Sequence, residues 1–333
     1  MRSPLSRPTI PTGPRRSSGW QRSPIPRTKR VEIQAARRDY LWCGLSLLLL
    51  LGMQLVAGVL IALLMLFASL PQELFMPVTL VVSTVVGDLP PILLLSRMVG
   101  IPLKSLFTGE HHLEKWVGPG FLMMVGASFA SGYLAVAIEA LLSAAGIELW
   151  SPELTLPFDL PGCVLMLLAV SVLAPMLEEL LFRGLLLRTF TRYGPRFAIF
   201  ASAMLFAFTH GNLTQGVGTF FMGILLAVIA QRAGSVLPTV MIHMFYNTFA
   251  MLINTAVELP SEVAVAAANG FFVIFGLVCV GYLVVRYLKR RPVFPPKCPE
   301  SKLFGFRRLL RSWPVDVFLA LCFLMALVPA QMH

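Results

Sequence analysis

Long apolar segments alternate with short polar ones over most of the chain. After residue 40 there are nine such segments, and a helix needs about 20 residues to cross a bilayer. They cover 41–69, 75–96, 117–143, 161–182, 197–211, 217–231, 236–256, 264–285 and 315–331. The fifth and sixth are short enough for core helices, but their place in the alternation predicts membrane spans. The pattern therefore predicts an all-α, polytopic transmembrane helical bundle of about nine helices.

Composition supports a membrane environment for most of the chain. Of the 333 residues, 57% are hydrophobic and 13% are charged, and the mean hydropathy is +0.78. Soluble domains carry about 25% charged residues. Too little polar surface remains to cover a soluble core of this size, so we expect an integral, multi-pass membrane protein. It would lie in the plasma membrane of a prokaryote or an endomembrane of a eukaryote.

The basic residues are confined to alternate loops. With a cytosolic N-terminus, five segments lie inside: 1–40, 97–116, 183–196, 232–235 and 286–314. Together they hold all 27 Lys and Arg residues. The outside loops instead carry acidic residues: Glu73, Glu148, Glu153, Asp159, Glu258 and Glu262. This agreement with the positive-inside rule predicts a cytosolic N-terminus. It also explains the net charge of +11 by topology and by contacts with membrane lipid, so no nucleic acid is expected as a partner.

Four regions follow from this reading. Residues 1–38 hold ten Lys and Arg and no apolar run, which predicts a disordered basic cytosolic tail. A membrane-embedded helical domain covers 39–286. A basic cytosolic linker covers 287–314, and an extra C-terminal transmembrane helix lies within 315–333.

Ionisable residues inside a span are costly and become functional candidates by default. Asp88 lies in Gly-Asp-Leu-Pro-Pro, where we expect the prolines to break the helix and give the carboxyl a structural role. Glu139 and Asp316 lie within a turn or two of an expected interface. We interpret these three acids as structural or interfacial residues.

The fourth segment ends in the pattern E-E-x-x-x-R. Glu179 and Arg183 are four residues apart, on one helix face, and can form an ion pair. Glu178 is rotated by about 100° from Glu179 and points elsewhere. One carboxylate can therefore be neutralised while the other stays available for chemistry.

Two further segments carry polar residues at helical spacing. The fifth contains Phe206 and His210 in the pattern F-x-x-x-H, and the seventh contains His243 and Asn247 in the pattern H-x-x-x-N. With a rise of about 1.5 Å per residue, their depths overlap in the inner half of the membrane. Glu178 is expected about 5–10 Å from the cytosolic end of its segment. We expect these residues to line a cavity open to the cytosol.

The three motifs, in this order on three helices, resemble the CPBP family, which contains type II CAAX prenyl endopeptidases and Abi-type bacterial proteins. The resemblance covers about 175–250 and implies an intramembrane peptidase acting near the cytosolic half of the bilayer. The implied substrate is a peptide or lipidated protein, prenylated or otherwise membrane-associated.

The resemblance also implies roles for individual residues. Glu178 would activate a water molecule as general base, with His210 positioning that water. His243 and Asn247 would stabilise the oxyanion. Glu179, Arg183 and Phe206 would support them.

A metal-dependent mechanism uses the same residues. Two histidines and a carboxylate, here Glu178, His210 and His243, could bind a divalent metal such as zinc. The H-E-x-x-H motif is absent from the chain. We favour chemistry that requires no cofactor and leave the metal alternative open.

Other classes of protein fit the pattern less well. A rhomboid-like site could recruit Ser128 but finds no suitable partner, and a presenilin-like site would need a second Asp beside Asp88. A proton-coupled transporter could use the same acids and histidines as a relay, but no inverted repeat is visible. A non-catalytic membrane scaffold or immunity protein is the remaining alternative.

Overall fold

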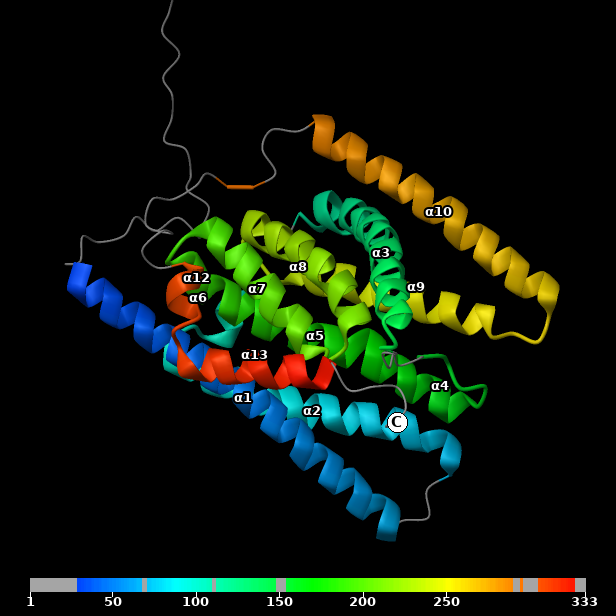
Figure 1. The fold of residues 1–333 in the computed structure, drawn as a ribbon, viewed down its shortest axis with the longest axis horizontal. Coiled ribbons are helices and arrows are strands. Elements are labelled where there is room, and N and C mark those ends of the chain that lie inside the picture. The colour runs from blue at the N-terminus through cyan, green and yellow to red at the C-terminus, as the bar shows by residue number, and fades with distance from the viewer. Residues whose placement is uncertain are drawn as a thin grey trace, which may run out of the picture.

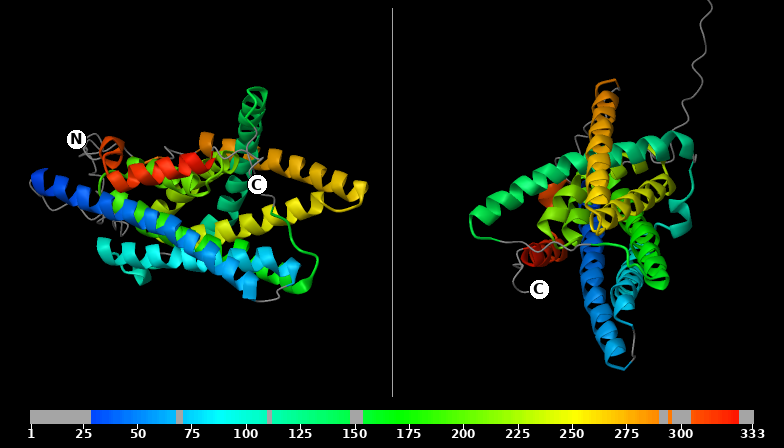
Figure 2. Two further views of the ribbon diagram at one scale, coloured as in Figure 1. Left: turned by 60° about the horizontal axis from the view of Figure 1, so that its bottom comes forward. Right: turned by 90° about the vertical axis from the view of Figure 1, so that its right-hand side faces the viewer.

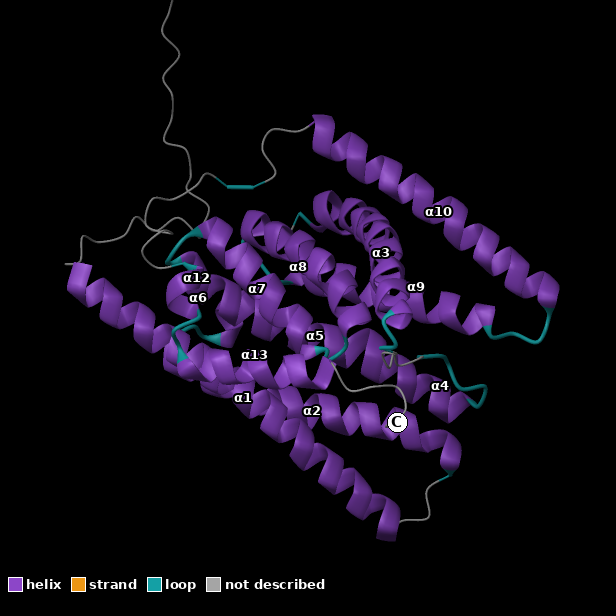
Figure 3. Ribbon diagram, viewed as in Figure 1, coloured by secondary structure: helices purple, strands orange, loops and turns teal. Residues whose placement is uncertain are grey.

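The structure, a computed structural model, describes residues 29–67, 71–109, 112–147, 154–289, 294–295 and 305–326. Within these ranges the chain forms helices and loops and no strand (Figure 3). The all-α prediction is confirmed. The predictions for the tail up to residue 28, for Glu148 and Glu153, for most of the linker and for 327–333 lie outside the described residues.

The first two long helices, α1 (Lys29–Phe67) and α2 (Gln72–Val99), pack side by side as a hairpin (Figure 1). The prediction of a disordered tail up to residue 38 was wrong for residues 29–38, which already belong to α1. Ala36 and Tyr40 are fully buried there, and the Tyr40 ring packs edge-on against Phe190. Burial of this face stabilises the first turns of α1.

Helix α2 runs through all of its prolines. Pro90 and Pro91 lie inside it, so the predicted break near Asp88 was wrong. Ile92 and Leu95, directly after the prolines, are fully buried. In membranes, neighbouring helices make such prolines tolerable. The helix instead ends at Gly100, whose φ of 68° is readily adopted only by glycine.

The central element is a long helix with two widened parts. It consists of α4 (Leu160–Met166), η2 (Leu167–Leu173), α5 (Ala174–Glu179), η3 (Leu180–Leu186) and α6 (Leu187–Thr191). Both η2 and η3 are π-helical, a rare form that is frequently found at functional sites. The helix extends past the apolar segment predicted for 161–182: all residues of η3 are buried, and α6 ends at Thr191.

Three shorter helices follow the central one. They are α7 (Pro195–Thr209), α8 (Leu213–Ala233) and α9 (Leu237–Val257). The Asn212 side chain caps α8 by accepting a hydrogen bond from the Gln215 N–H at 2.9 Å. Gly223 lets α8 approach α7, since a Cβ there would lie 3.1 Å from Ala203 Cβ.

The remaining helices lie on the outside of this centre, and one of them, α3 (Leu113–Ala144), projects from it (Figure 2). The others are η1 (Leu103–Leu106), α10 (Glu262–Lys289), α12 (Phe306–Leu309) and α13 (Trp313–Ala326). Helix α3 packs on α8 and α10, whereas α13 packs on α1 and α7. The last helix therefore belongs to the same bundle.

The basic segments meet one another at one end of the bundle. Arg192 Nη1 lies 3.1 Å from Asp39 Oδ2, and Arg192 Nη2 donates to the Val99 carbonyl at 3.2 Å. Arg188 donates to the carbonyls of Ser105 at 2.8 Å and Gly234 at 3.3 Å. The segments predicted to lie on one side of the membrane are thus joined by hydrogen bonds.

The buried Asp39 carboxylate also accepts a hydrogen bond of 2.7 Å from the Tyr193 hydroxyl. Burial, followed by the neighbouring carboxylate, raises the pKa of Tyr193 well above its usual value. The hydroxyl therefore remains a protonated donor and keeps the α6–α7 turn attached to α1.

Seven described helices are long and apolar enough to cross a membrane: α1, α2, α3, the Leu160–Thr191 helix, α8, α9 and α10. Two shorter apolar helices, α7 and α13, complete the nine predicted segments. The chain is an integral, multi-pass membrane protein, and the predicted number of about nine helices agrees with this structure.

Candidate active site

The centre of the bundle contains a fully buried ion pair. Arg183 Nη1 lies 2.7 Å from Glu179 Oε1, and both side chains have an exposed fraction of 0%. The predicted i,i+4 pairing is confirmed. A buried charge is costly unless it is paired, and this pair joins Glu179 at the end of α5 to Arg183 in η3.

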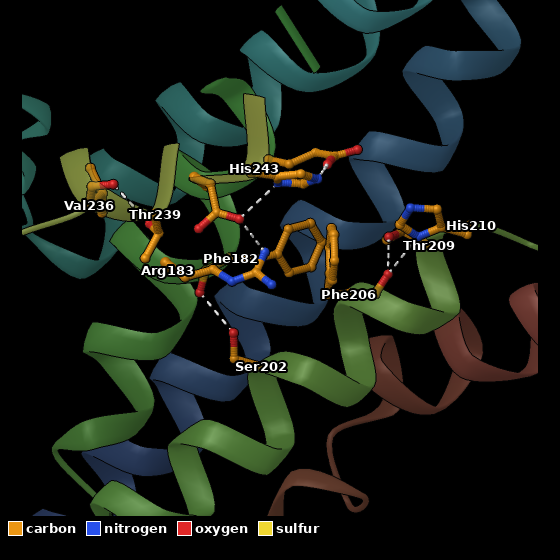
Figure 4. A network of polar contacts seen from close by, with 11 residues as sticks. Phe182, Arg183, Ser202, Phe206, Thr209, His210, Val236, Thr239 and His243 are labelled. Carbon is orange, nitrogen blue, oxygen red and sulfur yellow. Dashed lines mark hydrogen bonds and ion pairs between the residues drawn. The ribbon is translucent and has the colours of Figure 1, made fainter. Parts of the chain in front are cut away.

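Phe206 and His243 complete the surroundings of this pair (Figure 4). The guanidinium carbon of Arg183 lies 4.2 Å from the centre of the Phe206 ring, which offers a cation–π contact. Nε and Nη2 of Arg183 have no hydrogen-bond acceptor among the described residues. The electron-rich ring face therefore compensates part of the desolvation of the guanidinium.

His243 lies between the two neighbouring glutamates. Its Nδ1 is 3.1 Å from Glu179 Oε1, and its Nε2 is 3.8 Å from Glu178 Oε2. The Phe206 ring stands perpendicular to the imidazole, with ring centres 6.0 Å apart. The Glu179 carboxylate holds the ring, so that Nε2 is the nitrogen directed toward Glu178.

Glu178 is the accessible member of the glutamate pair. Its side chain has an exposed fraction of 23%, compared with 0% for Glu179. The predicted divergence of the two carboxylates is confirmed. Since the helix continues to Thr191, Glu178 lies about 20 Å along the helix from its basic end, and its depth in the membrane stays a prediction.

Glu178 borders a polar cavity of about 120 Å³. The lining also includes Asp88 of α2 and the ends of α7 at Thr209 and His210. Ser83, Thr84 and Gln54 contribute further polar groups from the α1–α2 hairpin. Such a space can hold several water molecules with polar partners. Water can therefore reach the Glu178 carboxylate inside the bundle.

His210 lies on the same cavity but is not bonded to Glu178. Its Nδ1 is 3.0 Å from the Phe206 carbonyl oxygen, and its ring packs edge-on against the Phe206 ring. This fixes the ring at the end of α7. Because Nδ1 is occupied, Nε2 is the nitrogen that remains for water or substrate.

Asn247 lies one turn beyond His243 and faces the π-helical segment η2. Its Nδ2 donates to the Val170 carbonyl at 2.9 Å. Neither His243 nor Asn247 lines the cavity, although the His243 and His210 rings both pack edge-on against Phe206. An amide N–H of Asn247 is left over for a further partner.

The proposed metal ligands do not form a metal-binding group. Among the described residues, no three His, Cys, Asp or Glu side chains are arranged to hold a metal ion. His243 faces Glu179 with one nitrogen, while His210 lines the cavity that Glu178 borders. The residues in this arrangement do not fit a zinc site, and we derive no step through a metal.

The position of Asp88 at the candidate site was not predicted from the sequence. We interpreted it as structural, yet it lines the cavity together with Glu178. A signal was present in the sequence, because Thr84 and Asp88 are four residues apart and give α2 a polar face.

Ser128, which a rhomboid-like site would have used, instead shares a hydrogen bond with the Tyr246 hydroxyl.

The fold and the site together define a multi-pass membrane protein in which Glu178 and His210 line a polar cavity and His243 lies beside Glu178. Residues 160–249 match the family described as "Type II CAAX prenyl endopeptidase Rce1-like". This stretch runs from the start of α4 into α9 and contains all seven residues of the motifs.

A protein of Escherichia coli, described as "Uncharacterized 24.3 kDa protein", is 30% identical over 160 residues. The aligned part covers 42% of this chain and 71% of that protein. No solved structure matches the chain. The chain belongs to the Rce1-like family, and the family is one of CAAX-type intramembrane proteases.

Proposed function

We propose that the protein is an intramembrane endopeptidase that hydrolyses a peptide bond with water activated by Glu178. The observation that carries the proposal is the position of this carboxylate, between a polar cavity and the imidazole of His243. A general base must be within reach of the water it deprotonates. The cavity supplies that water, and the buried Glu179–Arg183 pair keeps the neighbouring carboxylate from competing for it.

The rest of the site supplies orientation and charge stabilisation. Glu178 takes a proton from the water, whose oxygen bonds to the carbonyl carbon of the substrate. His210 orients the water from the cavity side, while His243 Nε2 and the free N–H of Asn247 stabilise the oxyanion. Arg183 and Phe206 act indirectly, because they hold Glu179 and His243 in place.

The family description supports a prenylated or otherwise membrane-associated peptide as the proposed substrate. A CAAX motif is a C-terminal sequence whose cysteine becomes prenylated, which anchors the protein to a membrane. A prenylated peptide, or another membrane-associated peptide, would reach the site from the cytosolic side of the bilayer. No cofactor is required in this mechanism.

The test uses the full chain reconstituted in proteoliposomes, with a prenylated CAAX peptide and its unprenylated form. We expect wild type to release a product that mass spectrometry can identify, and Glu178→Ala and His243→Ala to abolish its release. Glu139→Gln is the matched control. Glu139 is an intramembrane acid outside the cavity that accepts a hydrogen bond from Thr214 at 2.5 Å, and a glutamine can still accept it.

Cleavage that persists in both alanine variants would overturn the assignment of the site. Absence of cleavage by wild type, together with Glu178-dependent proton flux across the vesicle membrane, would favour a transporter instead. Absence of both activities would favour a non-catalytic scaffold.

A further inference from the structure

Asp88 is a buried carboxyl in the middle of a membrane-spanning helix. It lies in α2, and 8% of the residue is exposed. Its side chain makes no hydrogen bond or ion pair with any described residue. An isolated charge in such a place is costly, so an unpaired carboxyl avoids this cost by carrying a proton.

The other buried acids of the described chain, unlike Asp88, have hydrogen-bond and ion-pair partners. Asp39 is bound by Arg192 and the Tyr193 hydroxyl, and Glu179 is bound by Arg183 and His243. Each of these has a cationic partner and a clear structural role. Asp88 has neither, which separates it from the residues that hold the bundle together.

The surroundings of Asp88 are those of the candidate active site. It lines the same cavity as Glu178 and His210, which are the other titratable groups there. The remaining polar lining groups are neutral: Gln54, Ser83, Thr84 and Thr209. A substrate nitrogen that leaves the carbonyl on the cavity side would meet a protonated carboxyl on α2, in the lining that Asp88 shares with the base on α5.

We propose that Asp88 is the general acid of the reaction, the group that gives its proton to the departing amine. This inference rests on the proposed peptidase function and adds to it a residue on a different helix. Amide hydrolysis needs such a proton, because an amide anion is a very poor leaving group.

The proton balance requires no further reactant. Water gives one proton to Glu178 and its oxygen forms the new bond to the carbonyl carbon. As the C–N bond breaks, the nitrogen takes the proton of the Asp88 carboxyl, and the amine leaves. Glu178 is then protonated and Asp88 ionised. Transfer of one proton from Glu178 to Asp88 through the cavity water restores the starting state.

The experiment compares two substrates that differ only in their leaving group. The first is the prenylated CAAX peptide, and the second joins the same acyl portion to nitrophenol through an ester. Nitrophenolate leaves without being protonated, so the ester needs Glu178 but no general acid. We expect Asp88→Asn to lower kcat for the peptide by about a hundredfold or more while hydrolysis of the ester changes little.

Further variants separate a chemical role from a structural one. Asp88→Glu keeps a carboxyl and should retain part of the peptide activity, whereas Glu178→Gln should lose both activities. Thr84→Val, on the same face of α2, should affect both substrates alike. If Asp88→Asn does not fold, Asp88→Ser provides the same comparison.

An equal loss on both substrates in a folded Asp88 variant, or no loss on either, would overturn the role of Asp88. Failure of wild type to cleave both substrates would instead overturn the peptidase function itself. The two failures are therefore distinguishable.

Discussion

The imidazole of His243 is held by a carboxylate that never reaches the cavity: its Nδ1 lies 3.1 Å from Oε1 of Glu179. That same oxygen lies 2.7 Å from Arg183 Nη1. One oxygen atom therefore orients the histidine from α9 and neutralises the arginine of the central helix. The two adjacent glutamates thus have different roles: Glu179 binds Arg183 and His243, and Glu178 faces the cavity.

Replacing Glu179 by glutamine should damage stability as well as activity. Glu179→Gln keeps the shape but leaves the Arg183 guanidinium buried without a counter-charge, which costs about 3–5 kcal/mol in comparable pairs. Thermal unfolding in detergent, followed by size-exclusion chromatography, measures the effect. Glu178→Gln is the matched control, because its partly exposed carboxylate has no arginine to leave unpaired.

The double variant Glu179→Leu with Arg183→Met should recover much of the stability and none of the activity. It replaces both charges by apolar groups of similar size. Stability unchanged in Glu179→Gln alone would contradict the role assigned to the ion pair.

The helix count and the ion pair could be predicted because each depends on local spacing. Apolar segments of membrane length and the i,i+4 interval of Glu179 and Arg183 are properties of one helix. The grouping of basic residues predicted which loops share a side of the membrane. Arg188 and Arg192 do join several of these loops, through Ser105, Gly234 and Val99.

The features that could not be predicted from the sequence depend on contacts between helices. The prolines of α2 predicted a break, but packing of Ile92 and Leu95 keeps the helix intact. The position of Asp88 could not be predicted either, because it depends on the hairpin of α1 and α2, which places Asp88 at the cavity of Glu178. The π-helical turns of η2 and η3 had no signal in the spacing of the apolar residues.

Removal of the Phe206 ring should weaken the site without unfolding the bundle. Phe206→Leu loses the ring 4.2 Å from the Arg183 guanidinium and its edge contacts with His210 and His243. We expect a stability loss of about 1–2 kcal/mol and a larger proportional fall in kcat than in substrate affinity. Steady-state kinetics on the prenylated peptide separate the two parameters.

Phe200→Leu on the same helix is the control for Phe206. Its ring stacks on Phe294, with ring centres 5.5 Å apart. Equal kinetic effects of the two substitutions would show that Phe206 acts through general packing of α7 and not through the site.

Chelation should leave the peptidase active. The described histidines and acids do not converge as metal ligands, and the proposed base acts on cavity water directly. We expect the rate on the prenylated peptide to be unchanged after prolonged treatment with a strong zinc chelator. Loss of activity, restored by zinc and accompanied by stoichiometric zinc in the purified protein, would contradict the metal-free mechanism.

The last helix should detach when its contact with α1 is blocked. A Cβ at Gly44 would lie 2.7 Å from the Val315 backbone nitrogen, so no side chain fits there without moving α13. Gly44→Val should therefore destabilise the protein by about 1–3 kcal/mol. It should also expose Cys322 of α13, which is 1% exposed, to a maleimide reagent, with the labelled peptide identified by mass spectrometry.

The matched control for this contact is Gly52→Val, which lies on the same helix and has nothing within 4 Å of an added Cβ. Both substitutions add the same residue to the same membrane helix, so a difference between them reports the contact with α13. Labelling of Cys322 that is equally slow in both variants would mean that α13 does not depend on Gly44.

The same variant shows whether α13 affects catalysis. If Cys322 is labelled quickly in Gly44→Val while this variant still cleaves the prenylated peptide at the wild-type rate, α13 stabilises the bundle and does not affect the chemistry. A loss of cleavage in that variant alone would tie α13 to the active site. Met325 lies near Gly211, the neighbour of His210, since a Cβ added to Gly211 would lie 3.1 Å from Met325 Cε.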